Sequence, residues 1–445
     1  MITRSSISVS SDNGAVRCSY DMRKPISTLA MSTAKSGIYK IGAAACLGDI
    51  KIIRVSHDIH AVSVTEQCCS SKSVTITDIC WSSVDPMNLV ASYSNGSISR
   101  FNLSEKVTPF TLTCTFDFDR LSTYSINRIS CHPTEDQIIA TASADGIVKL
   151  YDFRASKNIS SQVLKFGQRG LGATKDVQFN PFIDNVFAEV SENGTLKIWD
   201  RRNSDKPVMS KMKAHLNHIT SVSWHPSSHW ILATGSKDKT AKVWDFSVCD
   251  YQVTVTPDKN SGEPLLLHTI NASSEIGRLV WTPKSTEGMK LKMQLATIST
   301  TATSLPAAAP SGHISVWDVT KPIVNVPICV LKGHGVETCT SIQWLDGLLS
   351  SAASAPSSAT AATASTSSKS KKAKPKEGVS QSGKSQPSAY FVLSGGKDGK
   401  LLIQDLSLGY HPLTHANPTV TAISSQGHVS FHRSGSQQVA HDYRY

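Results

Sequence analysis

The sequence lacks several features that would assign it to a functional class. Its 445 residues contain no uninterrupted apolar run near the roughly 20 residues of a membrane span. The first residues have no apolar core of a secretory signal. The ten cysteines include no C-x-x-C pair, which argues against a zinc ribbon or a thioredoxin-like site. We therefore expect mostly buried free thiols in a reducing compartment, no membrane span, no metal and no cofactor.

Acidic residues are scarce as well, with 34 Asp and Glu against 45 Lys and Arg, so the net charge is +11. Such a charge can indicate binding to nucleic acid or to an anionic membrane. Nearly half of the excess comes from residues 348–388, a tract built from Ser, Ala, Thr, Lys and Pro. This composition cannot form a core and predicts a disordered insertion, so nucleic acid is not the expected partner. Its residues 369–376 keep a nuclear-import or nucleic-acid patch open as an alternative.

Residues 378–385 of the same tract, GVSQSGKS, match the phosphate-binding pattern G-x-x-x-x-G-K-[ST]. A working loop of this kind follows a buried strand and leads into a helix, because backbone N–H groups must converge on the phosphates. Here KKAKPKE precedes the motif and Pro387 follows it, so neither neighbour is predicted. We interpret the match as a chance result of composition and expect no nucleotide site.

What the chain does contain is repetition. Each repeat has a short alternating strand, a turn, an apolar strand, a turn containing Asp or Gly, and a third strand. Five good copies lie at 127–153, 175–200, 220–245, 277–318 and 340–405, a weaker one at 77–102 and a degenerate one at 27–55. The spacing of 45 to 50 residues between the closing residues of successive copies is close to that of a WD40 blade.

The repeats predict an all-β, seven-bladed WD40 β-propeller over residues 26–407. The last two blades are expected to carry long disordered insertions at 285–311 and 348–388. Residues 1–25 and 408–445 flank the propeller. Each flank offers a strand that would close the ring, at 15–20 or at 419–423, and the sequence does not choose between them.

One blade carries a full set of polar side chains at the spacing of the WD40 hydrogen-bond relay. Its members are His215, Thr234, Asp238 and Trp244. The aspartate position recurs as Asp145 and as Asp398, although the blade of Asp398 has Gln404 where the relay needs Trp. A His, a hydroxyl and an Asp also occur in hydrolases, but the repeat spacing favours a structural relay. No enzymatic activity is therefore expected.

The ordered motifs HPTEDQIIATASADGIVKLYDFR, KDVQFNP, ENGTLKIWDRR, GHISVWDV and LSGGKDGKL carry a resemblance to a particular family. Together they resemble the N-terminal propeller of the family of WD-repeat subunit twenty-four of the GATOR complex, whose fungal relatives sit in the SEA complex. The resemblance spans about residues 26–430. It implies a non-catalytic scaffold that promotes amino-acid signalling to the target-of-rapamycin kinase complex.

The resemblance also implies partners and a location. The partners would be protein subunits of a multi-protein complex, with no small-molecule substrate. The location would be cytoplasmic, with peripheral association at the lysosome or vacuole through those partners. Family members carry a C-terminal helical region and a RING-like zinc end, and the sequence up to Tyr445 shows neither. We expect the functions attributed to that end to be absent from this chain.

Two neighbouring blades end in a W/Y-D-x-R motif, YDFR at 151–154 and WDRR at 199–202. In propeller substrate receptors of cullin-type ubiquitin ligases, the arginine of this motif pairs with an adaptor. Such a receptor is therefore the alternative function. The candidate partner-binding residues are Asp152, Arg154, Asp200 and Arg202. An arginine that merely solvates the loop between two blades would explain the same pattern.

Overall fold

The computed structural model describes residues 16–33, 39–56, 62–64, 74–104, 111–118, 122–154, 163–170, 172–247, 263–283, 294–299, 312–321, 324, 326–334, 337–345, 391–406, 420–425 and 428–433. The insertion at 348–388, with the GVSQSGKS motif and the lysines of 369–376, lies outside these residues. No helix long and apolar enough to span a membrane occurs in the described part of the chain.

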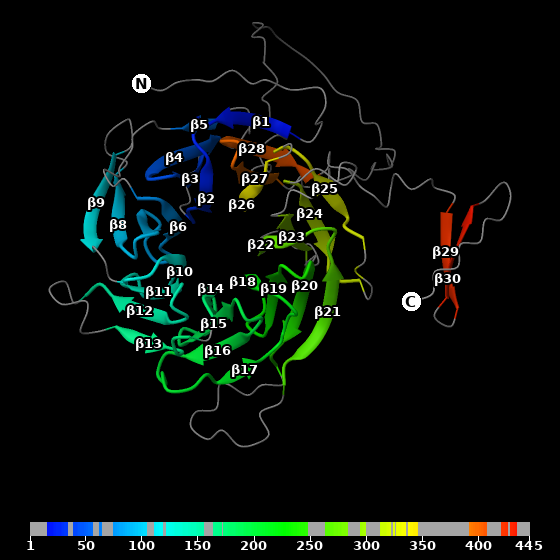
Figure 1. Cartoon of the computed structure of the whole chain (residues 1–445). Coiled ribbons are helices and arrows are strands. Elements are labelled where there is room, and N and C mark those ends of the chain that lie inside the picture. Colours follow the sequence, from blue (N-terminus) through cyan, green and yellow to red (C-terminus); the bar gives the residue numbers. More distant parts are fainter. Residues whose placement is uncertain are drawn as a thin grey trace, which may run out of the picture.

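Seven four-stranded antiparallel sheets form a ring around a central channel, which confirms the predicted seven-bladed propeller (Figure 1). Within each blade the first strand lies nearest the channel and the fourth lies outermost (Figure 1). Blade 1 contains β2 (Ile26–Met31), β3 (Tyr39–Cys46), β4 (Asp49–Ser56) and β5 (Val62–Val64). Blade 2 contains β6 (Ile76–Trp81), β7 (Asn88–Tyr93), β8 (Ile98–Ser104) and β9 (Thr111–Phe118). Blade 3 contains β10 (Ile126–Cys131), β11 (Ile138–Ser143), β12 (Val148–Asp152) and β13 (Leu164–Phe166).

The next three blades repeat this order. Blade 4 contains β14 (Thr174–Phe179), β15 (Val186–Ser191), β16 (Leu196–Asp200) and β17 (Met209–Lys211). Blade 5 contains β18 (Ile219–Trp224), β19 (Ile231–Ser236), β20 (Thr240–Asp245) and β21 (Leu265–Asn271). Blade 6 contains β22 (Ile276–Trp281), β23 (Gln294–Ser299), β24 (Ile314–Asp318) and β25 (Cys329–Leu331).

Blade 7 joins the two ends of the propeller. It contains β26 (Cys339–Leu345), β27 (Phe391–Gly396), β28 (Lys400–Asp405) and, as its outer strand, β1 (Val16–Asp21). β1 runs antiparallel to β28, with Tyr20 opposite Leu401. The other candidate region forms β29 (Val420–Ser425), which pairs with β30 (His428–Arg433) in a separate two-stranded sheet. The strand that closes the ring is therefore N-terminal.

The second strand of each blade lies between two neighbouring sheets and is apolar for that reason. Every residue of β7, β11, β15, β23 and β27 is buried. An outer strand can face solvent instead, as in blade 5, where most of β21 is exposed or half-buried. One expectation from the sequence was wrong. The insertion expected at 285–311 contains β23, a buried strand of blade 6. Its short QLATIS run is flanked by residues rich in Ser, Thr, Ala and Lys, which obscured it.

The turn between the second and third strands requires a left-handed backbone conformation. Gly96, Gly146, Gly194 and Gly399 occupy it with φ between 73° and 81°. A Cβ at Gly194 would lie 2.5 Å from the carbonyl oxygen of His215, so a larger residue would clash with the loop that enters the next blade. Blade 5 has Lys239 at the corresponding turn, at φ 68°.

Candidate functional site

The predicted relay residues of blade 5 form one continuous hydrogen-bonded chain. Trp244 Nε1 donates to Thr234 Oγ1 over 2.9 Å, and that hydroxyl lies 2.8 Å from His215 Nε2. His215 Nδ1 lies 3.0 Å from Asp238 Oδ2. A single neutral tautomer satisfies both histidine contacts, with Nδ1–H donating to the carboxylate and Nε2 accepting from the hydroxyl.

The relay is buried, and burial favours the neutral form of its histidine. Burial lowers the pKa of His215, although Asp238 opposes the effect. Burial also disfavours ionised Asp238, but hydrogen bonds from His215 and Thr240 outweigh it and lower the pKa of that carboxyl. His215 is 2% exposed and Thr234 is 0% exposed. A hydroxyl sealed in this way cannot meet a substrate, so the geometry suits a structural fastener.

Blade 7 builds a related relay around Asp398. His334 Nδ1 lies 3.0 Å from Asp398 Oδ1, and its Nε2 lies 3.0 Å from Ser394 Oγ. Gln404 stands in the tryptophan position, with Oε1 3.3 Å from Ser394 Oγ. Its Nε2 donates to the carbonyl of Lys332 over 2.8 Å. The relay expected to be incomplete thus continues through an amide.

Asp145 in blade 3 has no histidine partner. Lys149 Nζ lies 3.3 Å from Asp145 Oδ2 and donates to Ser122 Oγ over 3.0 Å. The serine stands where blade 5 has its histidine, so an ion pair with Lys149 takes the place of the histidine contact. Blade 4 differs again, because Glu189 accepts from Trp199 Nε1 over 2.6 Å and from Thr174 Oγ1 over 3.1 Å.

Equivalent side chains from the seven innermost strands surround the channel. In every blade a bulge follows the first residue of that strand, and the residue after the bulge faces the channel. We call these residues the channel ring: Thr28, Asp78, Arg128, Asp176, Ser221, Arg278 and Ser341. Three members accept a backbone N–H from the next blade. These bonds run from Ile129 to Asp78 (3.1 Å), from Val222 to Asp176 (2.9 Å) and from Leu279 to Ser221 (3.3 Å).

Both arginines of the channel ring interact with Asp78, one from the adjacent blade and one from across the channel. Arg128 Nη1 donates to Asp78 Oδ1 over 3.2 Å, and Arg278 Nη2 lies 4.0 Å from the same oxygen. Arg278 Nη1 also donates to the hydroxyls of Thr28 and Ser341, each over 3.1 Å. Burial raises the pKa of Asp176, and the two arginines oppose this. Two arginines and two aspartates balance in formal charge.

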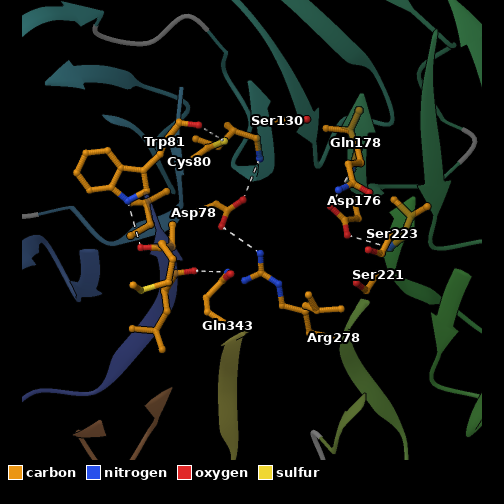
Figure 2. Close-up of a pocket in the computed structure, with 18 of the residues that line it drawn as sticks. Asp78, Cys80, Trp81, Ser130, Asp176, Gln178, Ser221, Ser223, Arg278 and Gln343 are labelled. Atoms are coloured by element: carbon orange, nitrogen blue, oxygen red, sulfur yellow. Dashed lines mark hydrogen bonds and ion pairs between the residues drawn. The ribbon is translucent and has the colours of Figure 1, made fainter. Parts of the chain in front are cut away.

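A cavity of about 270 Å³ lies beside the channel ring (Figure 2). Polar side chains on its wall hydrogen-bond to adjacent blades. Gln178 Oε1 accepts from Trp224 N over 2.7 Å, and Gln343 Nε2 donates to the carbonyl of Leu29 over 3.1 Å. Among the described residues no three His, Cys, Asp or Glu side chains gather to hold a metal ion. The polar groups of the cavity wall thus join adjacent blades.

A groove of about 570 Å³ opens between blades 3 and 4, where both W/Y-D-x-R motifs end. In each motif the aspartate holds the arginine that follows it. Arg154 Nε lies 2.9 Å from both carboxylate oxygens of Asp152, and Arg202 Nε lies 2.9 Å and 3.1 Å from those of Asp200. The side chains of Arg154 and Arg202 are 60% and 51% exposed. The four predicted partner-binding residues are thus brought to one region of the surface.

Glu135 connects the two motifs across the blade boundary. Its carboxylate lies 3.3 Å from Arg154 Nη2 and 2.6 Å from Arg201 Nη2. Arg201 Nε donates to Asn185 Oδ1 over 2.7 Å. Apolar side chains complete the groove, and one of them, Leu164, is 47% exposed. Oriented arginines beside apolar surface are typical of sites that recognise carboxylates of a protein partner.

Sequence reasoning identified both arginine motifs and the blade 5 relay, but it missed the channel ring and the contribution of Glu135. The ring has a readable signal, since its members stand two positions after the first residue of each innermost strand. Glu135 has none, because its contact with Arg201 joins a turn of blade 3 to the end of the next blade.

The closed ring of four-stranded sheets and the blade 5 relay define the class of protein, a seven-bladed propeller with WD40 repeats. The family model for "WD domain, G-beta repeat" matches residues 112–152 and 206–245, and the second match contains the whole relay. A chain in a structure titled "Crystal Structure of Mitotic Checkpoint Complex" has the same fold. The TM-score is 0.56, with 14% identity over 91% of this chain and 95% of that one.

More specific similarity confirms the resemblance in the sequence motifs. The chain is similar to the GATOR2 complex protein WDR24 of Danio rerio, with 24% identity over 364 residues, which are 81% of this chain and 36% of the relative. The protein of the same name from Homo sapiens is 27% identical over 277 residues, covering 62% of this chain and 30% of the relative. The chain therefore spans about a third of the length of the curated relatives it matches.

Proposed function

We propose that this chain is a non-catalytic scaffold that acts as the propeller of a GATOR2-type complex. The carrying observation is similarity to GATOR2 complex proteins over 81% of the chain. The internal bonding of the relay and channel ring supports it, since these polar groups stabilise blades rather than face a substrate. The partners are protein subunits of that complex. Through them the chain associates peripherally with the lysosome or vacuole and promotes amino-acid signalling to the target-of-rapamycin kinase complex.

The groove between blades 3 and 4 is the contact surface that we assign to this role. An arginine already held by its own aspartate loses little side-chain freedom when it binds a partner, so less of the interaction energy is spent on ordering. Exposed ion pairs contribute only about 0–1 kcal/mol, so a partner carboxylate can share or replace them at small cost. The apolar wall supplies the area that such a contact needs.

Affinity purification of the tagged full chain from cells, followed by mass spectrometry, tests the proposal. We expect GATOR complex subunits to be recovered, and to be reduced at least tenfold for the Arg154→Glu/Arg202→Glu variant, because two reversed charges repel the partner carboxylate. The control is Lys237→Glu/Lys321→Glu, which makes the same change in charge at two exposed positions outside the groove. Equal recovery with both variants would exclude the groove, and absence of the complex from all samples would exclude the scaffold.

A cullin-type substrate receptor is the second candidate, favoured by one observation. Both W/Y-D-x-R motifs meet at a single groove instead of lying on separate faces. In that case the same purification would recover a cullin adaptor in place of GATOR subunits. Loss of the adaptor with Arg154→Glu/Arg202→Glu would then assign the arginines to adaptor binding.

A further inference from the structure

Cys80 and Cys131 occupy positions at which neighbouring blades touch. In blade 3 the side chain two positions after the channel ring is Ser130, whose Oγ accepts the N–H of Phe179 from blade 4 over 3.1 Å. Cys80 has the position of Ser130 in blade 2, and Cys131 has the position of Phe179 in blade 3. The repeat geometry therefore directs the backbone N–H of Cys131 toward the sulfur of Cys80.

The sulfur contacts agree with this placement. The Cys131 thiol donates to the carbonyl of Cys80 over 3.9 Å, between residues 51 positions apart. The Cys80 thiol itself donates to the carbonyl of Trp81 over 3.4 Å. The thiol and the backbone N–H of Cys131 lie close enough to lower the pKa of Cys80. Both cysteines are free and half-buried, and Cys80 lies on the wall of the cavity near Trp81 and Ser130 (Figure 2). A small reagent in the channel can reach this sulfur.

The surroundings of the two thiols shift their pKa values in opposite directions. The nearby donors of Cys131 lower the pKa of Cys80, whereas the proximity of Cys80 and burial raise the pKa of Cys131 well above its usual range. At Cys339, by contrast, burial raises the pKa to about 12. The thiolate is the reactive form, so Cys80 is the more reactive member of the pair.

We propose that Cys80 and Cys131 are a redox modification site that forms a reversible disulfide between blades 2 and 3 when a peroxide enters the channel. The Cys80 thiolate attacks one peroxide oxygen, the O–O bond breaks, and hydroxide leaves as Cys80 becomes a sulfenic acid. The Cys131 thiol loses its proton and attacks the Cys80 sulfur, which releases a second hydroxide and forms the S–S bond. Two thiols and one hydrogen peroxide give one disulfide and two waters. The oxidised pair joins two blades covalently, independently of partner binding.

Peptide mapping of the full chain tests the proposal. The purified, reduced protein is treated with hydrogen peroxide, its remaining thiols are blocked with N-ethylmaleimide, and it is digested without reduction. We expect a cross-linked pair of peptides containing Cys80 and Cys131, about 2 Da lighter than the reduced pair because two hydrogens are lost, and separated again by dithiothreitol. Cys114→Ser, a change at an exposed cysteine, should leave the cross-link intact.

The order of attack gives a second measurement. In Cys131→Ser, the sulfenic-acid reagent dimedone should label Cys80, whereas in Cys80→Ser it should not label Cys131. If a variant fails to fold, the peptide map of the wild-type protein is sufficient to test the proposal. Recovery of Cys80 and Cys131 on separate blocked peptides, at a peroxide dose that oxidises Cys114, would overturn it. A cross-link from either residue to another cysteine would overturn it too.

Discussion

Asp78 is the residue whose removal should most clearly expose the role of the channel ring. Its side chain is 3% exposed and accepts from Thr28 Oγ1 over 3.1 Å, as well as from Arg128 Nη1 and Ile129 N. Asp78→Ala leaves two guanidinium groups without this carboxylate. Removing one partner of a buried ion pair costs about 3–5 kcal/mol, because the remaining charge is left uncompensated. We expect a loss in this range.

Two further variants separate charge from shape. Asp78→Asn keeps an oxygen that can accept from Ile129 N, so only the charge is lost, and we expect a smaller cost of about 1–3 kcal/mol. Adding Arg278→Met to Asp78→Ala should recover part of the stability, because it removes one stranded charge. The control is Glu263→Ala, which deletes the carboxylate of an exposed ion pair with Lys211. Such a pair contributes about 0–1 kcal/mol.

Urea is the appropriate denaturant for these measurements, since guanidinium is itself a salt and screens ion pairs. Unfolding is followed by circular dichroism, and the variants are compared at constant ionic strength. If Asp78→Ala costs no more than Glu263→Ala, the ion pairs across the channel do not stabilise the propeller. The interpretation of the channel ring would then be wrong.

Three other predictions follow from the relay, the turns and the sequence. Trp244→Ala should lower the free energy of unfolding by about 3–5 kcal/mol in urea melts. Trp244→Phe should lower it by about 1 kcal/mol, because this change loses mainly one hydrogen bond. A loss under about 1 kcal/mol for the alanine variant would contradict the relay. Burial lowers the pKa of His132, so the unfolded chain binds its proton more tightly, and stability should fall as the pH drops below the unfolded-state value of about 6.5. His215 contributes a slope of the same sign, so His132→Asn should reduce the slope without abolishing it, because Asn180 caps the equivalent turn of blade 4 without titrating. An unchanged slope would exclude a contribution from His132. Millimolar ATP or GTP with Mg²⁺ should not change the melting temperature of the wild-type chain or of Lys384→Ala, since no strand or helix is predicted beside GVSQSGKS; a rise abolished by Lys384→Ala would reveal a nucleotide site.

The blades were predictable because their signals are local and recur. The apolar second strand and the Gly or Asp turn occur in nearly every copy, so each repeat supports the others. The blade 5 relay was predictable for the same reason. The closing strand was not, because two apolar segments qualified and only the pairing of β1 with β28 distinguishes them. The strand β23 was missed because its six residues are shorter than the polar sequence around them.

The candidate sites were harder to predict because they depend on how the copies differ. A Trp at the inner edge of the blade usually fastens it to the preceding one, as when Trp224 Nε1 donates to the carbonyl of Gln178 over 3.1 Å. At the corresponding position of blade 3 the donor is the thiol of Cys131, at 3.9 Å from its acceptor. A comparison of repeats treats such a change as degeneration of the motif.

In the folded ring, however, each exception has a particular neighbour. Cys131 occupies the position of the tryptophan and contacts Cys80, so this blade boundary contains two neighbouring thiols. Likewise, the charged members of the channel ring lie in blades 2, 3, 4 and 6, and Arg278 of blade 6 reaches Asp78 of blade 2 because the blades are arranged in a ring. Features shared by all blades therefore account for the fold, whereas departures from the repeat mark the positions where one blade does something that the others do not. The groove between blades 3 and 4 follows this logic, since it depends on an arginine motif in two adjacent copies and on a glutamate in only one of them.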